Sequence, residues 1–162
     1  MRKSNEKWFV ILLAGLLLMG LVACKSSGVA VTSEGQVIHV DINVPEDLSE
    51  GETKELAISV GNRGVSAMTN VVFEVEMPAE LVVLSAVPDE GLNGTEMTSP
   101  SGNKMFVYRS SNIQAMSTDT VRYHVRAAFG AMEKTGDIRV TAWSDDLPGE
   151  KLVETKLIKL RR

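Results

Sequence analysis

Apolar residues recur at every second position along most of this chain, and this alternation constrains the fold more than any other feature. It is clearest in residues 118–129, where the apolar positions are Val121, Tyr123, Val125, Ala127 and Phe129. A period of two places such side chains on one face of a strand, whereas a helix needs a period of about 3.6. No stretch beyond residue 24 shows a convincing helical period. The chain is therefore predicted to be all-β.

Similar segments, separated by Gly, Pro, Asn and Asp, predict the other strands. Their expected ranges are 37–44, 53–60, 70–77, 81–87, 104–109, 137–144 and 151–160. The run 81–87 is apolar throughout, which predicts a strand that is covered on both faces or that switches sheets. Residues 61–64 are expected to turn with Asn and Gly at positive φ, and residues 88–103 to form a long loop or irregular edge. Seven or eight short strands of this kind predict an antiparallel sandwich of two sheets.

The first 23 residues have the three parts of a secretory signal. A positive segment with Arg2, Lys3 and Lys7 is followed by the uncharged residues 8–23. The last three of these, Leu21, Val22 and Ala23, stand directly before Cys24. These four positions resemble the lipobox of bacterial lipoproteins. The resemblance implies that the Cys24 thiol receives a diacylglyceryl group, that the signal is cut before it, and that the new amino terminus is acylated. The alternatives are a buried core cysteine or a plain transmembrane anchor, although 16 uncharged residues are short for a span of about 20.

Removing the expected signal makes the chain more acidic. The 139 remaining residues hold 14 Lys and Arg against 20 Asp and Glu, so the net charge changes from −4 to −6. This balance argues against a nucleic-acid partner, which usually needs a basic face. With Cys24 as the single cysteine, no disulfide is expected. Lys25 stands where Gram-negative lipoproteins retained in the inner membrane commonly have Asp. In a Gram-negative source it favours the outer membrane, on its periplasmic or surface face. In a source with one membrane Lys25 is not informative, and the exterior of the plasma membrane is expected.

The domain organisation follows from these boundaries. Residues 1–23 are assigned to the lipoprotein signal peptide, residues 24–36 to the lipidated cysteine with a flexible tether, and residues 37–162 to the sandwich domain. The tether is assigned from its Ser, Gly and Thr content. The alternative is that residues 29–31 add a short edge strand to the domain.

Four segments in a fixed order resemble a known repeat family. They read GET at 51–53, VGNRG at 60–64, TNVVFEVEMPAELVVLSA at 69–86 and VRYHVRAAFG at 121–130. The order is similar to that of the bacterial and archaeal immunoglobulin-like family called domain of unknown function eleven, and of the related cell-adhesion-type domain of bacterial surface proteins. The resemblance implies an extracellular immunoglobulin-like sandwich with structural, adhesive or scaffolding roles and without catalytic residues. The chain holds one repeat, which argues against a spacer stalk.

The titratable residues give no pattern of a catalytic or metal site. His39 and His124 both alternate toward the outer face, and no Cys, His or Asp spacing resembles a zinc site. Asp145, Asp146 and Glu150 lie in one loop that either binds calcium or is a solvated hairpin, and the hairpin is favoured because Leu147 and Pro148 intervene. Residues 93–95 match a glycosylation sequon, which in a bacterial lipoprotein is interpreted as an accidental match. No cofactor, metal ligand or catalytic residue is assigned.

Charged and aromatic side chains on the strands give the candidate contact residues. These are Arg122, His124 and Arg126, which face outward, and Trp143, which falls on the opposite parity to its strand's core residues. We expect Glu74 and Glu76 to lie across from Arg122 and Arg126 as cross-strand pairs, with Arg139 on the next strand. The basic C-terminal group either contacts anionic headgroups or is a frayed terminus. It consists of Lys156, Lys159, Arg161 and Arg162.

The sequence as a whole predicts a non-enzymatic cell-envelope lipoprotein. Its immunoglobulin-like domain is expected to serve adhesion or scaffolding by binding an envelope protein or polymer, and an open sheet edge is one means of doing so. Its expected partners are the membrane, through the lipid anchor, and this unidentified envelope component. The alternative is a carbohydrate- or small-ligand-binding accessory module, which a cluster of exposed aromatic side chains would favour.

Overall fold

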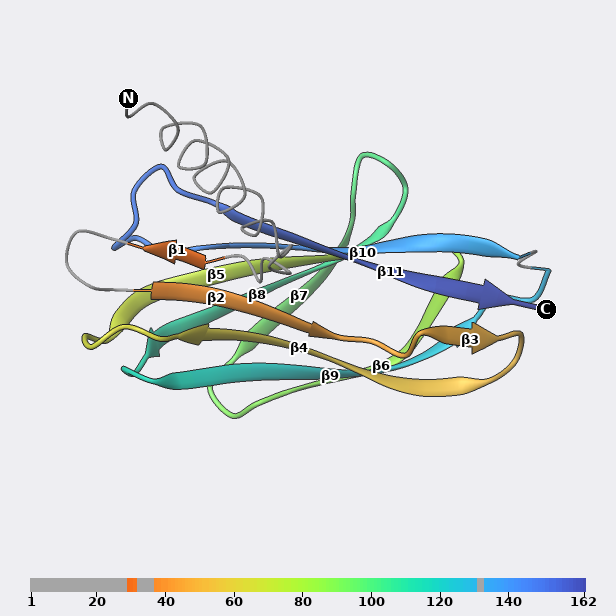
Figure 1. Cartoon of the computed structure of the whole chain (residues 1–162), viewed down its shortest axis with the longest axis horizontal. Coiled ribbons are helices and arrows are strands. Elements are labelled where there is room, and N and C mark those ends of the chain that lie inside the picture. The colour runs from red at the N-terminus through yellow and green to blue at the C-terminus, as the bar shows by residue number, and fades with distance from the viewer. Residues whose placement is uncertain (1–28, 32–36, 131–132) are drawn as a thin grey trace, which may run out of the picture.

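The computed structural model describes residues 29–31, 37–130 and 133–162. The predicted signal, Cys24 and most of the expected tether lie outside these residues. The described residues form eleven strands in two packed sheets and no helix, so none of them forms a helix long and apolar enough to cross a membrane (Figure 1). The prediction of an all-β sandwich is confirmed.

Sheet A has five strands in the order β1-β2-β4-β9-β6, all antiparallel. They are β1 (Val29–Val31), β2 (Val37–Asn43), β4 (Thr53–Asn62), β9 (Ser117–Ala127) and β6 (Leu81–Pro88). The strands β1 and β6 are therefore the two edges of this sheet. Strand β1 is the short edge strand that the sequence allowed as the alternative to a wholly flexible tether.

Sheet B has six strands in the order β3-β11-β10-β5-β8-β7. They are β3 (Asp47–Ser49), β11 (Leu152–Arg161), β10 (Lys134–Trp143), β5 (Met68–Met77), β8 (Lys104–Ile113) and β7 (Asn93–Thr98). All pairs are antiparallel except β3 with β11. Because β2 packs beside β11 and β8 beside β9, strands β6 and β7 form one side of the sandwich, and β1, β2, β3 and β11 form the other.

The core lies between the sheets and follows the alternation. On β5 the alternating buried side chains are Val71, Phe73, Val75 and Met77, with Met68 and Val72 buried as well, and on β9 they are Val121, Tyr123, Val125 and Ala127. Aromatic rings fill the centre: Phe73 stacks on Tyr108 with ring centroids 5.2 Å apart, and Phe106 meets Tyr123 edge-on at 5.4 Å. The inward faces of these strands were predicted correctly because one face of each strand is apolar along its length.

Two residues of the alternation lie on the unexpected side. Phe129 was predicted to face the core but is 75% exposed, because β9 ends at Ala127 and the chain then turns at Gly130, whose φ is +79°. His39 was predicted to face solvent but is only 8% exposed. Its ring lies against Gly61 of the neighbouring strand, where a Cβ atom would fall 2.2 Å from the His39 Cε1.

Residues 81–87 form neither a doubly covered strand nor a strand that switches sheets. They lie in β6, an edge strand with a bulge between Val83 and Ser85, and Leu84 and Val87 are 49% and 51% exposed. The prediction of a strand that is covered on both faces or that switches sheets, made from the apolar run, is therefore wrong. The following loop also contains a regular strand, β7, whose six residues are all exposed.

The turn after β4 depends on hydrogen bonding, since none of its residues has a positive φ. The Asn62 side chain is fully buried and donates through Nδ2 to the carbonyl oxygens of Ser66 (2.7 Å) and Ile113 (3.2 Å). Its Oδ1 accepts from the Gly64 N–H at 2.9 Å. Because Ile113 ends β8 of sheet B, this side chain ties the two sheets together at one end.

Candidate interaction surfaces

The predicted contact residues Arg122, His124 and Arg126 lie in a row on the outer face of β9, in sheet A. Each has a partner on a neighbouring element. Arg122 Nη1 lies 3.2 Å from Asp89 Oδ1, while the other oxygen of Asp89 accepts from the Thr120 N–H at 2.9 Å. Arg122 therefore helps to fix the chain after β6 to β9.

His124 joins residues from three strands. Its Nδ1 is 3.0 Å from Ser85 Oγ on β6, and its Nε2 is 3.7 Å from Glu55 Oε2 on β4. The order Ser, His, acid is that of a nucleophilic triad, but a triad also needs donors for an oxyanion and shelter from water. Here the His124 side chain is 47% exposed on a sheet face. The arrangement is a cross-strand polar contact.

Arg126 lies beside the exposed Phe129, with its guanidinium carbon 5.4 Å from the ring centroid. Its Nε is buried and has no hydrogen-bond partner among the described residues. Phe129 lies near the turn before β4, since a Cβ atom added to Gly51 would fall 3.8 Å from its ring. This aromatic and basic pair sits at the end of the sandwich where β9 ends.

The predicted pairing of Glu74 and Glu76 with Arg122 and Arg126 is wrong, because β5 is in sheet B and β9 in sheet A. Glu76 instead lies across from Arg139 of β10, a pair that this expectation did not name. Glu76 Oε1 accepts hydrogen bonds from three residues of the β7–β8 turn: Ser99 (3.0 Å), Ser101 (2.7 Å) and Asn103 (3.1 Å). These bonds, led by that from Ser101, lower the pKa of the Glu76 carboxyl.

Trp143 is half-buried at the end of β10, beside a hollow of about 390 Å³ formed by the β10–β11 loop. The Lys151 ammonium covers its ring, 4.4 Å from the centroid. The exposed Phe129 lies beyond the opposite end of β10, so it and Trp143 do not form a cluster. The remaining aromatics among the described residues are in the core.

The acidic residues of the same loop are used internally. Asp146 accepts from the Thr69 N–H (2.5 Å) and hydroxyl (3.1 Å), and Asp145 accepts from the Asn70 amide at 2.9 Å. These bonds fix the loop to the start of β5, where Asn70 has a φ of +48°. Within the described chain, no group of three or more His, Cys, Asp or Glu is placed to hold a metal ion.

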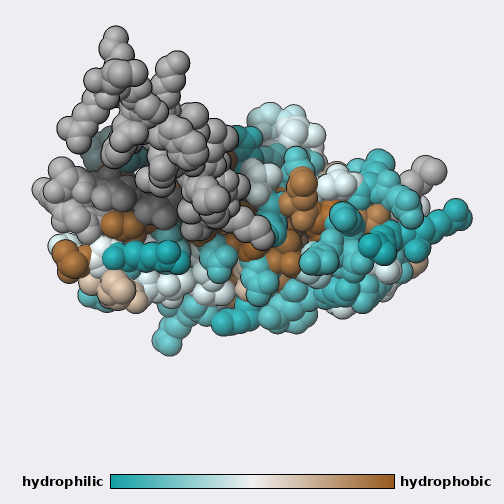
Figure 2. Space-filling view, in the orientation of Figure 1, coloured by the Kyte–Doolittle hydropathy of each residue, from teal (hydrophilic) through white to brown (hydrophobic). Residues whose placement is uncertain are grey.

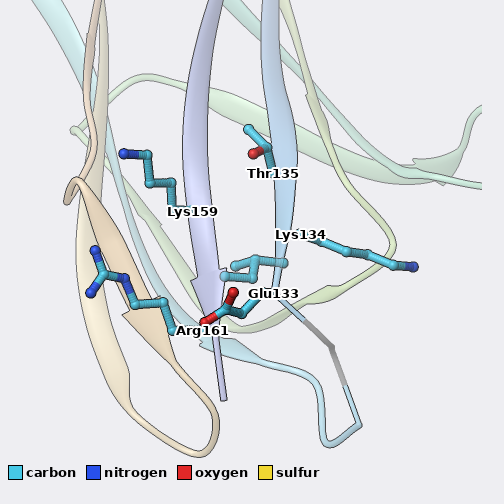
Figure 3. Close-up of a pocket in the computed structure, with 6 residues that line it drawn as sticks. Glu133, Lys134, Thr135, Lys159 and Arg161 are labelled. Atoms are coloured by element: carbon cyan, nitrogen blue, oxygen red, sulfur yellow. The ribbon is translucent and has the colours of Figure 1, made fainter.

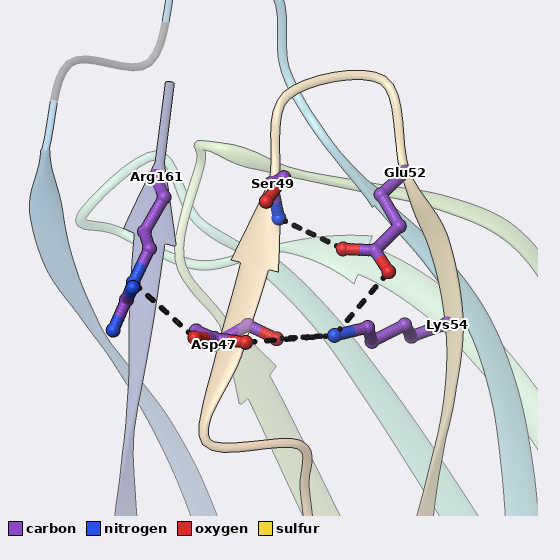
Figure 4. Close-up of polar contacts among 5 residues, drawn as sticks. All are labelled: Asp47, Ser49, Glu52, Lys54 and Arg161. Atoms are coloured by element: carbon purple, nitrogen blue, oxygen red, sulfur yellow. Dashed lines mark hydrogen bonds and ion pairs between the residues drawn. The ribbon is translucent and has the colours of Figure 1, made fainter.

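The basic C-terminal group lies on a well-formed strand. Lys159 and Arg161 point to the same side of β11 and, with Glu133, Lys134, Thr135 and Leu160, line a hollow of about 280 Å³ (Figure 3). Arg161 Nε lies 3.2 Å from Asp47 of β3, and Asp47 also pairs with Lys54 at 3.5 Å (Figure 4). The expected frayed terminus is therefore replaced by a strand held on both sides at its end.

The β6–β7 side was not identified from the sequence. Strand β6 looked like a covered strand because of its apolar run, and β7 looked like a loop because its residues are polar. In the sequence, Thr95 and Met97 alternate with Gly94 and Glu96, which is a weak signal of period two, and all four residues are exposed in β7. We define the β6–β7 side by its large exposed apolar residues, Leu84, Val87 and Met97.

Comparison with known proteins gives the fold but no family. No family model and no curated protein matches the chain. A type I cohesin from Clostridium thermocellum, solved as a cohesin–dockerin complex, is similar with a TM-score of 0.51 at 14% identity, over 75% of this chain and 93% of that one. A CARDB domain from Pyrococcus furiosus, solved with di-metal ions, has a TM-score of 0.52 at 14% identity, over 81% and 98%.

The same fold also occurs in an enzyme. AvmM, which catalyses macrocyclization in alchivemycin A biosynthesis, has a TM-score of 0.51 at 14% identity, over 82% of this chain and 91% of that one. At such low identity the likenesses show architecture alone. They agree with the strand order in showing that the described domain is an immunoglobulin-like β-sandwich.

Proposed function

We propose that this chain is a non-enzymatic, lipid-anchored protein of the bacterial cell envelope whose immunoglobulin-like domain binds another protein. The observation that carries the binding role is the β6–β7 side. Among the described strands, β6 and β7 each have one neighbour only, and Leu84, Val87 and Met97 on them are between 44% and 51% exposed. Unpaired strand edges with exposed apolar side chains are surfaces that a partner polypeptide covers.

The two strands favour different modes of contact. Backbone pairing along β6 is interrupted by its bulge and by Pro88, which has no N–H to donate. A partner on β6 is therefore expected to bury Leu84 and Val87 rather than to extend the sheet. Strand β7 pairs regularly with β8 over Asn93–Thr98 and can accept an added strand. The likeness in fold to a cohesin that was solved with its dockerin supports a protein partner.

The anchor is supported by the lipobox-like residues before Cys24. Its test is the Cys24→Ala protein, expressed in the source bacterium or a relative and compared with the wild type by mass spectrometry and membrane fractionation. The wild type is expected to carry diacylglyceryl on Cys24 and to be cut before it. Wild-type processing and membrane retention of Cys24→Ala would refute the anchor.

The binding role is tested with a photo-crosslinking amino acid placed at Leu84, with Val65 as the matched control. Val65 is also an exposed apolar residue, at 82%, but lies in the β4–β5 loop. Position 84 is expected to give one defined protein adduct that position 65 lacks, and Val87→Lys is expected to abolish it. Adducts that are the same from both positions, or that survive Val87→Lys, contradict the assignment of this side.

A carbohydrate or small-ligand role is the second candidate, and the hollow beside Trp143 is the observation that favours it. Lys151 already covers the indole face on which a sugar would stack. Trp143 is the single tryptophan beyond residue 23, so its fluorescence reports on this hollow directly. We expect no saturable change on titration with envelope oligosaccharides. A saturable change that Trp143→Phe removes would favour the second candidate.

A further inference from the structure

Strand β11 and the residues next to it differ in charge from the rest of the protein. Residues 151–162 contain five Lys and Arg and one acidic residue, a net charge of +4. Residues 24–150 contain nine Lys and Arg and nineteen Asp and Glu, a net charge of −10. The chain therefore places a basic strand at one edge of an otherwise acidic domain.

The structure makes this strand an ordered, exposed surface. Strand β11 pairs with β10 along its length and with β3 only over Lys159–Arg161, so most of its outer edge is uncovered by any described strand. We define the β11 surface as Val153, Leu157, Lys159 and Arg161, which are exposed on the outer face of the strand, together with Lys156, which is exposed on the opposite parity at the uncovered edge. Hydrophilic atoms gather at the end of the molecule where the C-terminus lies, and hydrophobic atoms adjoin them in the middle of the same view (Figure 2).

The chain enters the domain on this same side of the sandwich. Strand β1 is the edge of sheet A next to β2, and β2 packs beside β11 (Figure 1). Four residues separate Cys24 from Val29, the first residue of β1. Five steps of about 3.6 Å span about 18 Å even when fully extended. A lipid on Cys24 therefore keeps the β1 end of this side close to the bilayer, and Lys159 and Arg161 lie toward the other end of the same side (Figure 1).

We propose that the β11 surface rests on the anionic headgroups of the membrane that holds the lipid anchor. Lys156 and Lys159 attract a negatively charged surface, while the acidic remainder of the domain is repelled by it. The exposed Val153 and Leu157 lie on the same strand and can enter the boundary between headgroups and acyl chains. The domain is thereby oriented, with the β6–β7 side directed away from the membrane and open to a partner. This inference rests on the proposed anchor.

The experiment uses the full, processed protein in vesicles of equal parts phosphatidylglycerol and phosphatidylcholine. After lipidation has consumed Cys24, a single new cysteine in Leu157→Cys or in Leu84→Cys carries a fluorophore. The two positions are matched, since the side chains are 60% and 49% exposed and lie on opposite sides of the sandwich. Lipids with a headgroup spin label are expected to quench the fluorophore at 157 strongly and the one at 84 hardly at all.

Charge variants test the electrostatic part. Lys156→Glu with Lys159→Glu is expected to reduce quenching at 157 to the level at 84, as is replacement of phosphatidylglycerol by phosphatidylcholine. The control is Lys104→Glu with Arg109→Glu, which changes the same charge on β8 and is expected to leave quenching unchanged. Equal quenching at both positions, stronger quenching at 84, or full quenching in phosphatidylcholine alone would each overturn the proposal.

The two proposals fail in distinguishable ways. Mass spectrometry of the same sample shows whether Cys24 carries lipid, before any vesicle is made. An unmodified Cys24 refutes the anchor. A lipidated Cys24 with a fluorophore at 157 that is no more quenched than at 84 refutes the orientation and leaves the anchor standing.

Discussion

Replacing Asn62 with Ala should destabilise the domain more than the replacement of an ordinary exposed turn residue does, because the Asn62 side chain is buried and hydrogen-bonded. The substitution removes three hydrogen bonds and leaves two buried backbone groups, the Gly64 N–H and the Ile113 carbonyl, without their partner. The Ser66 carbonyl loses its bond too, but Ser66 is exposed and water can replace the amide. Each buried group left unpaired costs about 1–3 kcal/mol, so we expect a loss of about 3 kcal/mol in the free energy of unfolding.

The loss can be measured by urea unfolding of the full protein in a nonionic detergent, followed by far-ultraviolet circular dichroism. With an m-value of about 2 kcal/mol/M, the midpoint should fall by about 1.5 M. In a thermal scan the midpoint should fall by about 12 °C, at about 4 °C for each kcal/mol in a domain of this size. The control is Asn112→Ala, which removes an exposed amide near the same end of β8 and should change stability by less than about 0.5 kcal/mol.

The outcome decides between two accounts of residues 61–64. If Asn62→Ala costs no more than Asn112→Ala, the hydrogen bonds between the sheets contribute little, and the reasoning from burial is refuted. If the loss is large but Asn62→Gly restores it, a backbone preference determines the turn. We expect Asn62→Gly to be at least as unstable as Asn62→Ala, because the turn has no positive φ to relieve.

Three further predictions concern pH and packing. Burial, and then the charge of Arg63, lower the pKa of His39 below 6.5. As the pH falls, the unfolded chain therefore binds a proton at this position before the folded protein does, so stability falls as the pH drops through 6.5. His39→Gln should flatten this slope in urea titrations. The lowered pKa of Glu76 stabilises the fold above pH 4.5, and this stabilisation is lost as the pH falls through the folded-state pKa. At neutral pH, Glu76→Gln should therefore show protection factors in residues 99–103 that are as low as those of the wild type in acid, with each exchange rate corrected for the intrinsic rate at its pH. Gly94→Ala places a Cβ 2.6 Å from Cε1 of the buried Tyr108 ring. Because the ring has little room to move, the substitution should lower the free energy of unfolding by about 1–3 kcal/mol and change the near-ultraviolet circular dichroism.

Each of these has an outcome that contradicts it. A pH slope that persists in His39→Gln assigns the effect to another group, and the exposed His124 is then the one to replace. Exchange in residues 99–103 that is unchanged by Glu76→Gln means that the three hydrogen bonds do not hold the turn. An unchanged near-ultraviolet spectrum in Gly94→Ala means that β7, and not the ring, moves.

The sequence predicted which side of most strands is buried because period two fixes a face directly. Strands β4, β5 and β9 follow this rule, and their inward residues fill the core. The alternation does not say which strands are neighbours. The expected pairing of Glu74 with Arg122 failed for this reason, since it assumed that two strands with suitable faces share a sheet.

The edges were the least predictable part. In the sequence, an apolar run is the same whether the strand is covered or is an edge strand such as β6, where the bulge turns Leu84 outward. The polar residues of β7 are equally typical of a loop. His39 is buried because Gly61, a residue of another strand, leaves room for its ring. These features depend on contacts between distant segments, and the candidate binding side consists of such features.

The parallel pairing of β3 with β11 bears on the export step that the proposed lipid anchor requires. Strand β3 meets its partner, Lys159–Arg161, about 110 residues later in the chain. Sheet B cannot close until β11 has emerged, because β11 lies between β3 and β10. Contacts of such long sequence separation form slowly. If the chain is exported amino terminus first, sheet B therefore remains incomplete during export. It is completed only after β11, the basic strand, has crossed the membrane.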